Sequence, residues 1–403
     1  MRMVSGDTAE PSWQAHDGGV LALRVASPNL LLSAGHDRKV KAWRIEHGER
    51  VRSSSFSLVG EHQGSIFALD VKHGRVITGS FDRSAAIWTL PPGILDSDAT
   101  MPRQEAELPT AVVLGEHTGW VRDALLSKSH ALSIGCNLVN VWTPGESSDD
   151  TWPRLCLLDA GPSPGEEPWR RHDILRIALD PTEQWLFASL NDGSLRAWPA
   201  SRVFAAEDTE DNALDQTSTA RVEKGVEQGV APTAATRAHR GRVTALLSHS
   251  LALAAHTEPR TVVLSAGHDG DVQVHELMTE DGESRLQLVD KVHVGGASKI
   301  LCLAQASTST GTGSTGDTIQ FFCGNSDGGV FSINARFEVP DSQSSPLQMA
   351  SISSTELTSC SELDGGGRSG SGVSAIAVAG DPAGRPVLLC GQQDGKIRRT
   401  PVT

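Results

Sequence analysis

The chain has 403 residues, with 35 Lys and Arg against 49 Asp and Glu, and its formal net charge of −14 argues against general nucleic-acid binding, which needs many basic contacts to phosphates. Residues 1–14 lack the apolar segment of a signal peptide, and no run approaches the ~18 apolar residues of a membrane span, so we expect neither. The six cysteines form no CxxC pair, which favours reduced thiols and a cytoplasmic location, with the nucleus as an alternative.

One arrangement of residues returns along the chain. A His precedes a short apolar run; a second apolar run contains a Ser or Thr, an Asp follows four residues later, and a Trp six residues after that. In the first copy these residues are His16, Ser33, Asp37 and Trp43. In chain order, the three runs of the seven copies are 20–25, 30–37 and 40–43; 66–71, 76–82 and 85–88; 121–126, 131–137 and 139–142; 175–180, 186–192 and 195–198; 243–248, 262–269 and 272–275; 300–305, 319–327 and 330–333; and 373–378, 386–394 and 396–399.

These runs have the length and partial alternation of β-strands, and Gly, Asp and Asn bound them. A fourth strand precedes a His, for example at 57–60 and 112–115. Seven four-stranded units around an axis form a propeller. The pattern resembles the WD-repeat family, although its Trp-Asp dipeptide is never complete: Arg, Thr and Thr follow Trp43, Trp88 and Trp142. We therefore expect an all-β fold, a seven-bladed β-propeller of four-stranded antiparallel blades.

The resemblance also implies how the ring closes. The last copy reaches Thr403 after its third strand, and residues 12–15 lie where a fourth strand should precede His16. We predict that this N-terminal segment completes the last blade and so hides the strand edges of an open ring. Residues 1–403 then form one propeller, with repeats at about 16–57, 62–115, 117–160, 172–238, 239–292, 293–371, and 372–403 plus 10–15.

His16, Ser33 and Asp37 are also the residue types of a hydrolase triad. These types return in several copies with a Trp attached, whereas an enzyme needs one such set. In the WD-repeat family the set is a hydrogen-bonded strut inside a blade, so the resemblance implies a structural role for polar groups that satisfy one another. The residues assigned to these structural sets are His16, Ser33, Asp37, Trp43, His62, Thr78, Asp82, Trp88, His117, Ser133, Asn137, Trp142, His172, Asp192, Trp198, His239, Ser265 and Asp269.

We expect no catalytic residue, cofactor or metal site. No HxH, HExxH or Cys–His ligand spacing occurs, and no GxxxxGK[ST] phosphate loop. Some copies depart from the pattern: Ala188 replaces the hydroxyl residue of the fourth, and Cys323, Ile333 and Cys390 stand in the sixth and seventh. We therefore predict that the sixth and seventh blades are the least stable.

Four long segments, 91–110, 145–170, 203–236 and 336–370, are predicted to be flexible insertions that follow a third strand. Connections from a third to a fourth strand open on one face, here called the bottom. The top face carries the connections from a fourth strand to the next first strand and from a second strand to a third. The insertions hold 22 acidic and 7 basic residues, so the rest of the chain is nearly neutral. One of them could instead order on a partner.

The top face is predicted to combine arginines with exposed aromatic residues, which is the composition of binding hot spots. Arginines around a propeller mouth would attract an acidic or phosphorylated peptide. The alternative is that these are ordinary surface arginines and that Trp120 and Phe67 pack between blades. The candidate contacts are Phe67, Phe81, Trp120, Arg122, Arg176 and Arg242.

The expected function is that of a non-catalytic scaffold or adaptor for protein–protein interactions within a larger complex, by analogy with the fold. One alternative is a substrate receptor of a ubiquitin ligase, which the absence of Trp-Asp-x-Arg after any third strand disfavours. Another is a subunit of an RNA-processing or ribosome-biogenesis complex, against which the missing Lys/Arg-rich tail argues. Partners are expected to be proteins, without a membrane, a small-molecule substrate or direct contact with nucleic acid.

Overall fold

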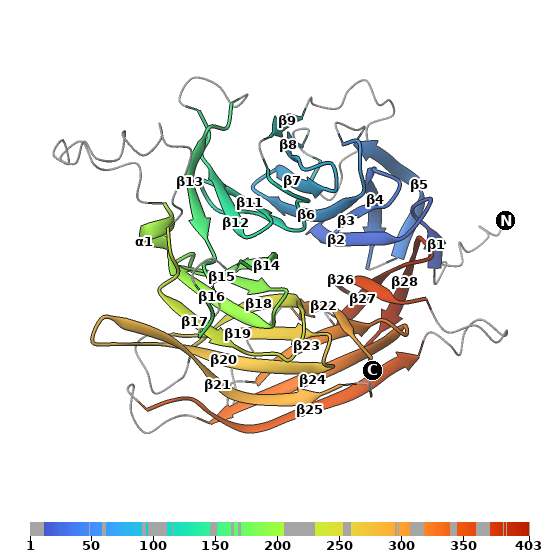
Figure 1. Cartoon of the computed structure of the whole chain (residues 1–403). Coiled ribbons are helices and arrows are strands. Elements are labelled where there is room, and N and C mark those ends of the chain that lie inside the picture. Colours follow the sequence, from blue (N-terminus) through green and yellow to red (C-terminus); the bar gives the residue numbers. More distant parts are fainter. Residues whose placement is uncertain are drawn as a thin grey trace, which may run out of the picture.

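The strands form seven separate four-stranded antiparallel sheets, which stand around a common centre (Figure 1). This confirms the predicted all-β, seven-bladed propeller. The computed structural model describes residues 12–47, 49–58, 62–90, 94–95, 111–115, 117–145, 151–162, 165–167, 171–204, 230–252, 259–294, 296, 298–306, 318–338, 345–359, 371–381, 383 and 385–402.

The first four blades each take consecutive strands. Blade one holds β2 (Val20–Ser27), β3 (Leu30–Gly35), β4 (Val40–Glu46) and β5 (Glu49–Leu58). Blade two holds β6 (Ile66–Lys72), β7 (Arg75–Ser80), β8 (Ala85–Thr89) and β9 (Val112–Leu114). Blade three holds β10 (Ala124–Leu126), β11 (Ala131–Gly135), β12 (Leu138–Trp142) and β13 (Arg154–Asp159). Blade four holds β14 (Ile174–Leu179), β15 (Trp185–Leu190), β16 (Ser194–Pro199) and β17 (Ala234–Arg237).

The next two blades have the longest outer strands. Blade five holds β18 (Val243–Leu251), β19 (Arg260–Gly267), β20 (Asp271–Glu280) and β21 (Glu283–His293). Blade six holds β22 (Ile300–Gln305), β23 (Thr318–Asn325), β24 (Gly329–Glu338) and β25 (Gln348–Ser359). Blade seven holds β26 (Val373–Gly380), β27 (Pro386–Gln392), β28 (Lys396–Pro401) and, from the start of the chain, β1 (Ser12–Gln14).

The strand β1 closes the ring as the sequence predicts. It pairs antiparallel with β28, with Trp13 opposite Ile397. Trp13 is only 4% exposed, and its ring contacts that of Trp43 in blade one, with the ring centroids 6.1 Å apart. The N-terminal segment therefore joins the last blade to the first through a buried aromatic contact as well as through backbone pairing.

The innermost strands, β2, β6, β10, β14, β18, β22 and β26, contact one another in cyclic order. A side-chain hydrogen bond crosses each of the seven boundaries between neighbouring blades near these strands. In ring order these bonds join Arg24 to Asp70, Asp70 to the amide of Leu126, Asp123 to the amide of Ile177, Ser189 to the carbonyl of Val243, Thr244 to that of Ile300, Cys302 to that of Val373, and Ser374 to that of Val20.

Two of the four predicted insertions contain a strand. The outer strand β13 lies within 145–170, and β25 lies within 336–370. The described residues 160–162, 165–167 and 171–173 therefore lie between a fourth strand and the next first strand, on the top side, so the expectation that all four segments follow a third strand is wrong for this part. The segment 203–236 begins at the end of the helix α1 (Ala200–Val203) and ends in β17. Of the described part of the chain, no helix has the length and apolar character needed to cross a membrane.

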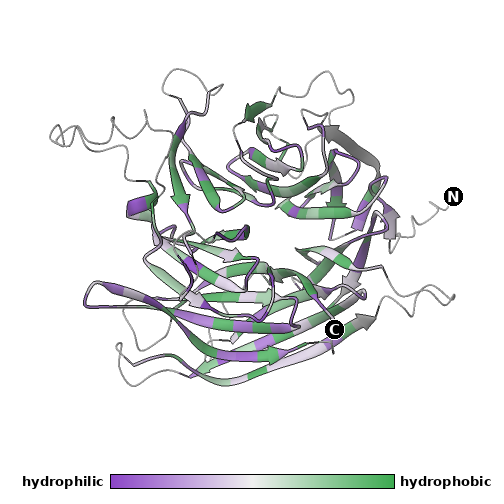
Figure 2. Ribbon diagram, viewed as in Figure 1, coloured by the Kyte–Doolittle hydropathy of each residue, from purple (hydrophilic) through white to green (hydrophobic). Residues whose placement is uncertain are grey.

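The core lies between neighbouring blades, where apolar residues of adjacent sheets pack together. The largest such cluster joins blades five and six through buried side chains that include Leu264, Phe321 and Ile333. Figure 2 shows apolar residues along the strands, whereas the tip of the β20–β21 hairpin is hydrophilic. Among the described residues the free cysteines are Cys136, Cys156, Cys302, Cys323 and Cys390; Cys360 lies outside them.

Candidate functional site

Blade one brings the four residues of its repeated set into one hydrogen-bonded chain. Nδ1 of His16 lies 2.7 Å from Oδ1 of Asp37, and Nε2 lies 2.8 Å from the Ser33 hydroxyl, which accepts a bond of 2.8 Å from Trp43 Nε1. Burial alone would raise the pKa of Asp37, but bonds from His16 and from the Asp17 and Lys39 amides hold it at about 2. An ionised Asp37 only accepts, so His16 donates through Nδ1 and accepts from Ser33 through Nε2.

Blades two and five repeat this geometry with one variation each. Nε2 of His62 lies 2.7 Å from the Thr78 hydroxyl and Nδ1 lies 3.2 Å from Asp82, while the Trp88 ring packs at 6.0 Å from the imidazole. In blade five Nε2 of His239 lies 2.9 Å from Ser265 and Nδ1 lies 3.0 Å from Asp269. There His275 replaces the Trp, and its desolvation, with the nearby His239, lowers its pKa to about 4.

Blade three keeps the hydroxyl bond but loses the acidic partner. Ser133 accepts from Trp142 Nε1 at 2.8 Å and lies 2.7 Å from His117 Nε2. Asn137 does not bond to His117; its amide donates to Asp159 instead. The assignment of Asn137 to the set is therefore wrong, because its side chain turns toward the outer strand. Desolvation lowers the pKa of His117 to about 4.

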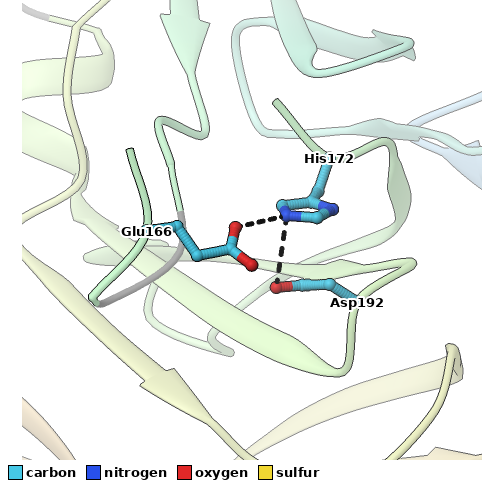
Figure 3. A group of neighbouring side chains, drawn as sticks. All are labelled: Glu166, His172 and Asp192. Atoms are coloured by element: carbon cyan, nitrogen blue, oxygen red, sulfur yellow. Dashed lines mark hydrogen bonds and ion pairs between the residues drawn. The ribbon is translucent and has the colours of Figure 1, made fainter. Parts of the chain in front are cut away.

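Blade four does not form the set at all. Its Ala188 offers no hydroxyl, Trp198 Nε1 donates to the carbonyl of Val230 at 3.0 Å, and the His172 ring faces Glu166 and Asp192 (Figure 3). Nε2 of His172 lies 2.6 Å from Glu166 and 3.9 Å from Asp192. The expectation that His172, Asp192 and Trp198 form one strut is therefore wrong.

Glu166, His172 and Asp192 are residue types that bind metal ions, and their ligand atoms lie within 4.8 Å of one another. The buried guanidinium of Arg196 in blade four explains why two carboxylates lie here. Arg196 is fully buried and donates to the carbonyls of Ala160 and Pro162. Burial lowers the pKa of Arg196, and the negative charges of Asp192 and Glu166 oppose that shift. The carboxylates of Glu166 and Asp192 therefore offset the charge of the buried Arg196. The bonds from Arg196 to the carbonyls of Ala160 and Pro162 fix the start of the connection that contains Glu166.

The His–Ser–Asp geometry is that of a hydrolase triad, but its burial does not suit catalysis. His16 and Ser33 are both 0% exposed, and the Ser33 oxygen already has His16 and Trp43 as partners. A nucleophile must reach a substrate carbonyl beside it. This arrangement instead satisfies buried polar groups inside a blade.

A row of stacked side chains lies on the top face across blades two and three. The Phe67 and Phe81 rings lie 6.4 Å apart, those of Phe81 and Trp120 lie 4.4 Å apart, and the Arg122 guanidinium lies 4.7 Å from the Trp120 ring. Phe81 is 45% exposed and Trp120 is 42% exposed. We call the three rings, those of Phe67, Phe81 and Trp120, the aromatic row. Phe81 and Trp120 are exposed although their rings contact each other across blades two and three.

Three arginines from three consecutive blades lie together beside this row. Arg176 Nη1 donates to the Arg122 carbonyl at 2.9 Å. Desolvation lowers the pKa of Arg122, the charges of Arg242 and Arg176 lower it further, and Asp173 opposes them. Within the described residues none of the three arginines has a carboxylate within 4.0 Å. All six candidate contacts therefore join one surface, the aromatic row with Arg122, Arg176 and Arg242, whose positive charges Asp173 opposes only in part.

Two features of this face could not be found from the sequence pattern. Glu166 lies in a connection that reads as an insertion, and only the structure places it against His172. The stacking of Phe81 on Trp120 joins a turn of one copy to a turn of the next. The signal that pointed to the row was only the presence of aromatic residues at predicted top-face positions.

Comparison with known proteins adds a family and a set of distant relatives. The WD domain, G-beta repeat family matches residues 9–44, which contain the complete set of blade one. The chain is 25% identical over 89 residues to the ribosome biogenesis protein YTM1 of Eremothecium gossypii, covering 20% of each chain. It is 24% identical over 167 residues to that of Ajellomyces capsulatus, covering 37% of this chain and 33% of the relative.

These alignments span between about a fifth and a third of the relatives' own length, so they carry no conclusion about whole-protein function. The family match falls on the one blade in which His, Ser, Asp and Trp form a complete hydrogen-bonded set. The remaining blades repeat the same four-stranded sheet around a closed ring. The chain is a seven-bladed β-propeller whose first blade matches the WD domain, G-beta repeat family.

Proposed function

We propose that this chain is a non-catalytic scaffold that docks an acidic or phosphorylated segment of another protein on its top face. The observation that carries the proposal is the aromatic row beside three arginines that lack a carboxylate partner among the described residues. Rigid aromatic side chains and arginines dominate binding energy at protein interfaces. Clustered guanidiniums select carboxylate or phosphate groups by charge-assisted, bidentate hydrogen bonds.

A non-catalytic role is supported by the burial of every hydroxyl in the repeated sets: Ser33, Thr78, Ser133 and Ser265 are all 0% exposed. A propeller that presents a rigid ring of loops needs no chemical step to bind a partner. The same burial supports the proposal that the sets of blades one, two, three and five are structural struts.

The test is affinity purification with mass spectrometry of the wild type and of a fourfold variant, Trp120→Ala, Arg122→Glu, Arg176→Glu and Arg242→Glu. A matched control carries Leu288→Ala, Arg285→Glu and Lys291→Glu on β21, where one exposed apolar side chain and two exposed cations lie on a different surface. We expect a partner that the wild type and the control retain and the fourfold variant loses.

Both variants must first show the wild-type unfolding midpoint and circular dichroism spectrum. If the folded fourfold variant keeps every partner of the wild type, the top face is not the docking surface. If the control loses the same partner, the charge change alone disrupts binding and the assignment to the top face is wrong.

A second candidate function is a subunit of a ribosome-biogenesis complex, and the observation that favours it is the similarity to relatives with that name. It is compatible with a scaffold. The test is cosedimentation of the tagged chain with precursor ribosomal particles on a sucrose gradient. Migration only with free protein would contradict it. The ubiquitin-ligase alternative gains no further support, and the cytoplasmic location stays a prediction that a fluorescent fusion would test.

A further inference from the structure

A cavity of about 740 Å³ lies at the centre of the ring, lined by residues of the innermost strands. Its lining combines apolar side chains, such as those of Leu21, Ile177 and Leu301, with the charged side chains of Arg24, Asp123 and Arg176. Phe67 and Arg176 line this cavity and also belong to the docking surface on the top face. Because each lies near the start of an inner strand that runs down from the top face, the cavity is continuous with that surface.

Arg176 is held in place by the backbone. Its Nη1 donates to the Arg122 carbonyl at 2.9 Å and to the Leu175 carbonyl at 3.1 Å. The structure gives Nε and Nη2 no hydrogen-bond partner among the described residues. A guanidinium fixed in this way loses little further freedom when a ligand binds, which favours affinity.

One acidic group, Asp123, lines the same cavity but forms no ion pair with this guanidinium within 4.0 Å. The Asp123 carboxylate accepts from the Ala124 amide at 3.0 Å and from the Ile177 amide at 2.9 Å. Desolvation raises the pKa of Asp123, and the charge of Arg176 only opposes that shift. Arg122 and Arg242 add positive charge, since the charges of Arg242 and Arg176 lower the pKa of Arg122. A half-buried cation without an ion pair among the described residues therefore faces the cavity, with apolar walls beside it.

We propose that a protein docked on the top face inserts an acidic side chain into this cavity, where its carboxylate pairs with Arg176 and its stem contacts the apolar walls. This inference rests on the proposed function, because the docked partner supplies the side chain. The charge around the mouth selects against a Lys or Arg in that position, since like charges there would be buried together. The cavity is then a specificity site within the broader docking surface.

The chemistry can be tested without the partner. The probe is phenylacetate, a carboxylate on an apolar body, and its matched control is phenylacetamide, which has the same shape and no charge. Binding is followed by saturation-transfer NMR on the full chain. We expect phenylacetate to bind about tenfold or more tightly than phenylacetamide, because a charge-assisted bond replaces a neutral one.

The variant Arg176→Met should abolish the preference for phenylacetate over phenylacetamide. Arg176→Lys keeps the positive charge but not the paired N–H donors of the guanidinium, so it should retain part of the preference. Arg285→Met is the matched control, since Arg285 is exposed on β21 far from the lining residues. Equal binding of the two probes by the wild type, or an unchanged preference in Arg176→Met, overturns the proposal. If Arg176→Met does not fold, the comparison of Arg176→Lys with the wild type decides it.

The outcome separates this inference from the proposed function. If a partner is lost from the fourfold variant but binds Arg176→Met as well as the wild type, docking stands and the inserted side chain is wrong. If phenylacetate binding depends on Arg176 and no partner uses the top face, the inserted side chain is also wrong, and the cavity takes a free carboxylate. Loss of the partner from Arg176→Met, together with the probe preference, supports the proposal.

Discussion

Blades one and six hold the same kind of sheet together by different means. In blade one a hydrogen-bonded chain runs from Trp43 through Ser33 and His16 to Asp37. In blade six Cys323 and Ile333 occupy the positions of the Ser and the Trp, and both are 0% exposed in a cluster with Phe321 and Phe337. One blade therefore satisfies its buried polar groups, and the other has replaced them with apolar packing.

A comparison of the blades shows which residue of the repeated set keeps the His side chain in its buried position. His293 has left blade six: its side chain is 54% exposed and Nδ1 bonds to Asp271 of blade five. His172 has also turned away, in a blade that has Ala188 in place of the hydroxyl. His117 keeps its position in blade three, where the hydroxyl is present and the acid is not. The hydroxyl, which accepts from the Trp and donates to the His, is thus the group on which the set depends.

The largest expected effect is in the apolar blade. Phe321→Ala removes a fully buried aromatic side chain between blades five and six, and we expect a loss of about 3–5 kcal/mol in the free energy of unfolding. Chemical denaturation measures it, with Leu288→Ala as the control at an exposed site, where we expect a change below about 0.5 kcal/mol. A loss below about 1 kcal/mol for Phe321→Ala would mean that packing does not replace the polar set.

A different measurement tests the prediction that blades six and seven are the least stable. Native-state hydrogen exchange would report the opening free energy of each blade. Blade seven depends on the three-residue pairing of β1 with β28, whereas blade six has the aromatic core. Faster exchange in both blades than in blade one supports the prediction, and uniform protection around the ring contradicts it.

A smaller effect is expected in the polar blade. Ser33→Ala leaves both Trp43 Nε1 and His16 Nε2 without their partner in a fully buried site, and we expect a loss of about 2–3 kcal/mol. Ser33→Thr is the matched control, because Thr78 fills this position in blade two. NMR of the His16 ring should show it leaving its site only in the Ala variant. A His16 ring that stays in place would show that the acid holds it.

The sequence predicts the ring, the strand order and the closure by the N-terminal segment, because each copy repeats strand length and turn residues and the last copy lacks one strand. The sequence pattern does not predict the strands β13 and β25. Half of residues 348–359 are Ser or Thr and the segment has little apolar alternation, so the sequence pattern suggests an insertion. Their placement depends on pairing with the long strand β24, a contact that no local pattern encodes.

The candidate site was predicted as a set of residue types rather than as a geometry. Aromatic and basic residues at turn positions indicate a top-face cluster, but the ring brings Phe81 and Trp120 into contact from two different copies. The hydrogen-bond partners of each His of the repeated sets were harder to predict. Asn137 and Asp192 occupy the expected positions in the sequence, but Asn137 donates to Asp159 and Asp192 accepts from Ser194 instead of bonding to the His as expected.

The smallest effect is a pH dependence that distinguishes the polar blade from the apolar one. The pKa of Asp37 is about 2 in the folded chain against an ordinary value of 3.8. Because the folded value is the lower one, the ionised form stabilises the fold above pH ~4, and this contribution of about 2 kcal/mol is lost as the pH falls through ~2. Asp37→Asn should therefore be less stable than the wild type at pH 6 and equally stable near pH 2.

The control is Asp327→Asn, at the same position of blade six. The difference in stability between this variant and the wild type should not shrink in the same way as the pH falls, because Asp327 bonds to Ser298 and not to His293. A deficit in Asp37→Asn that stays constant from pH 6 to pH 2 would mean that blade one depends on the shape of the carboxylate and not on its charge.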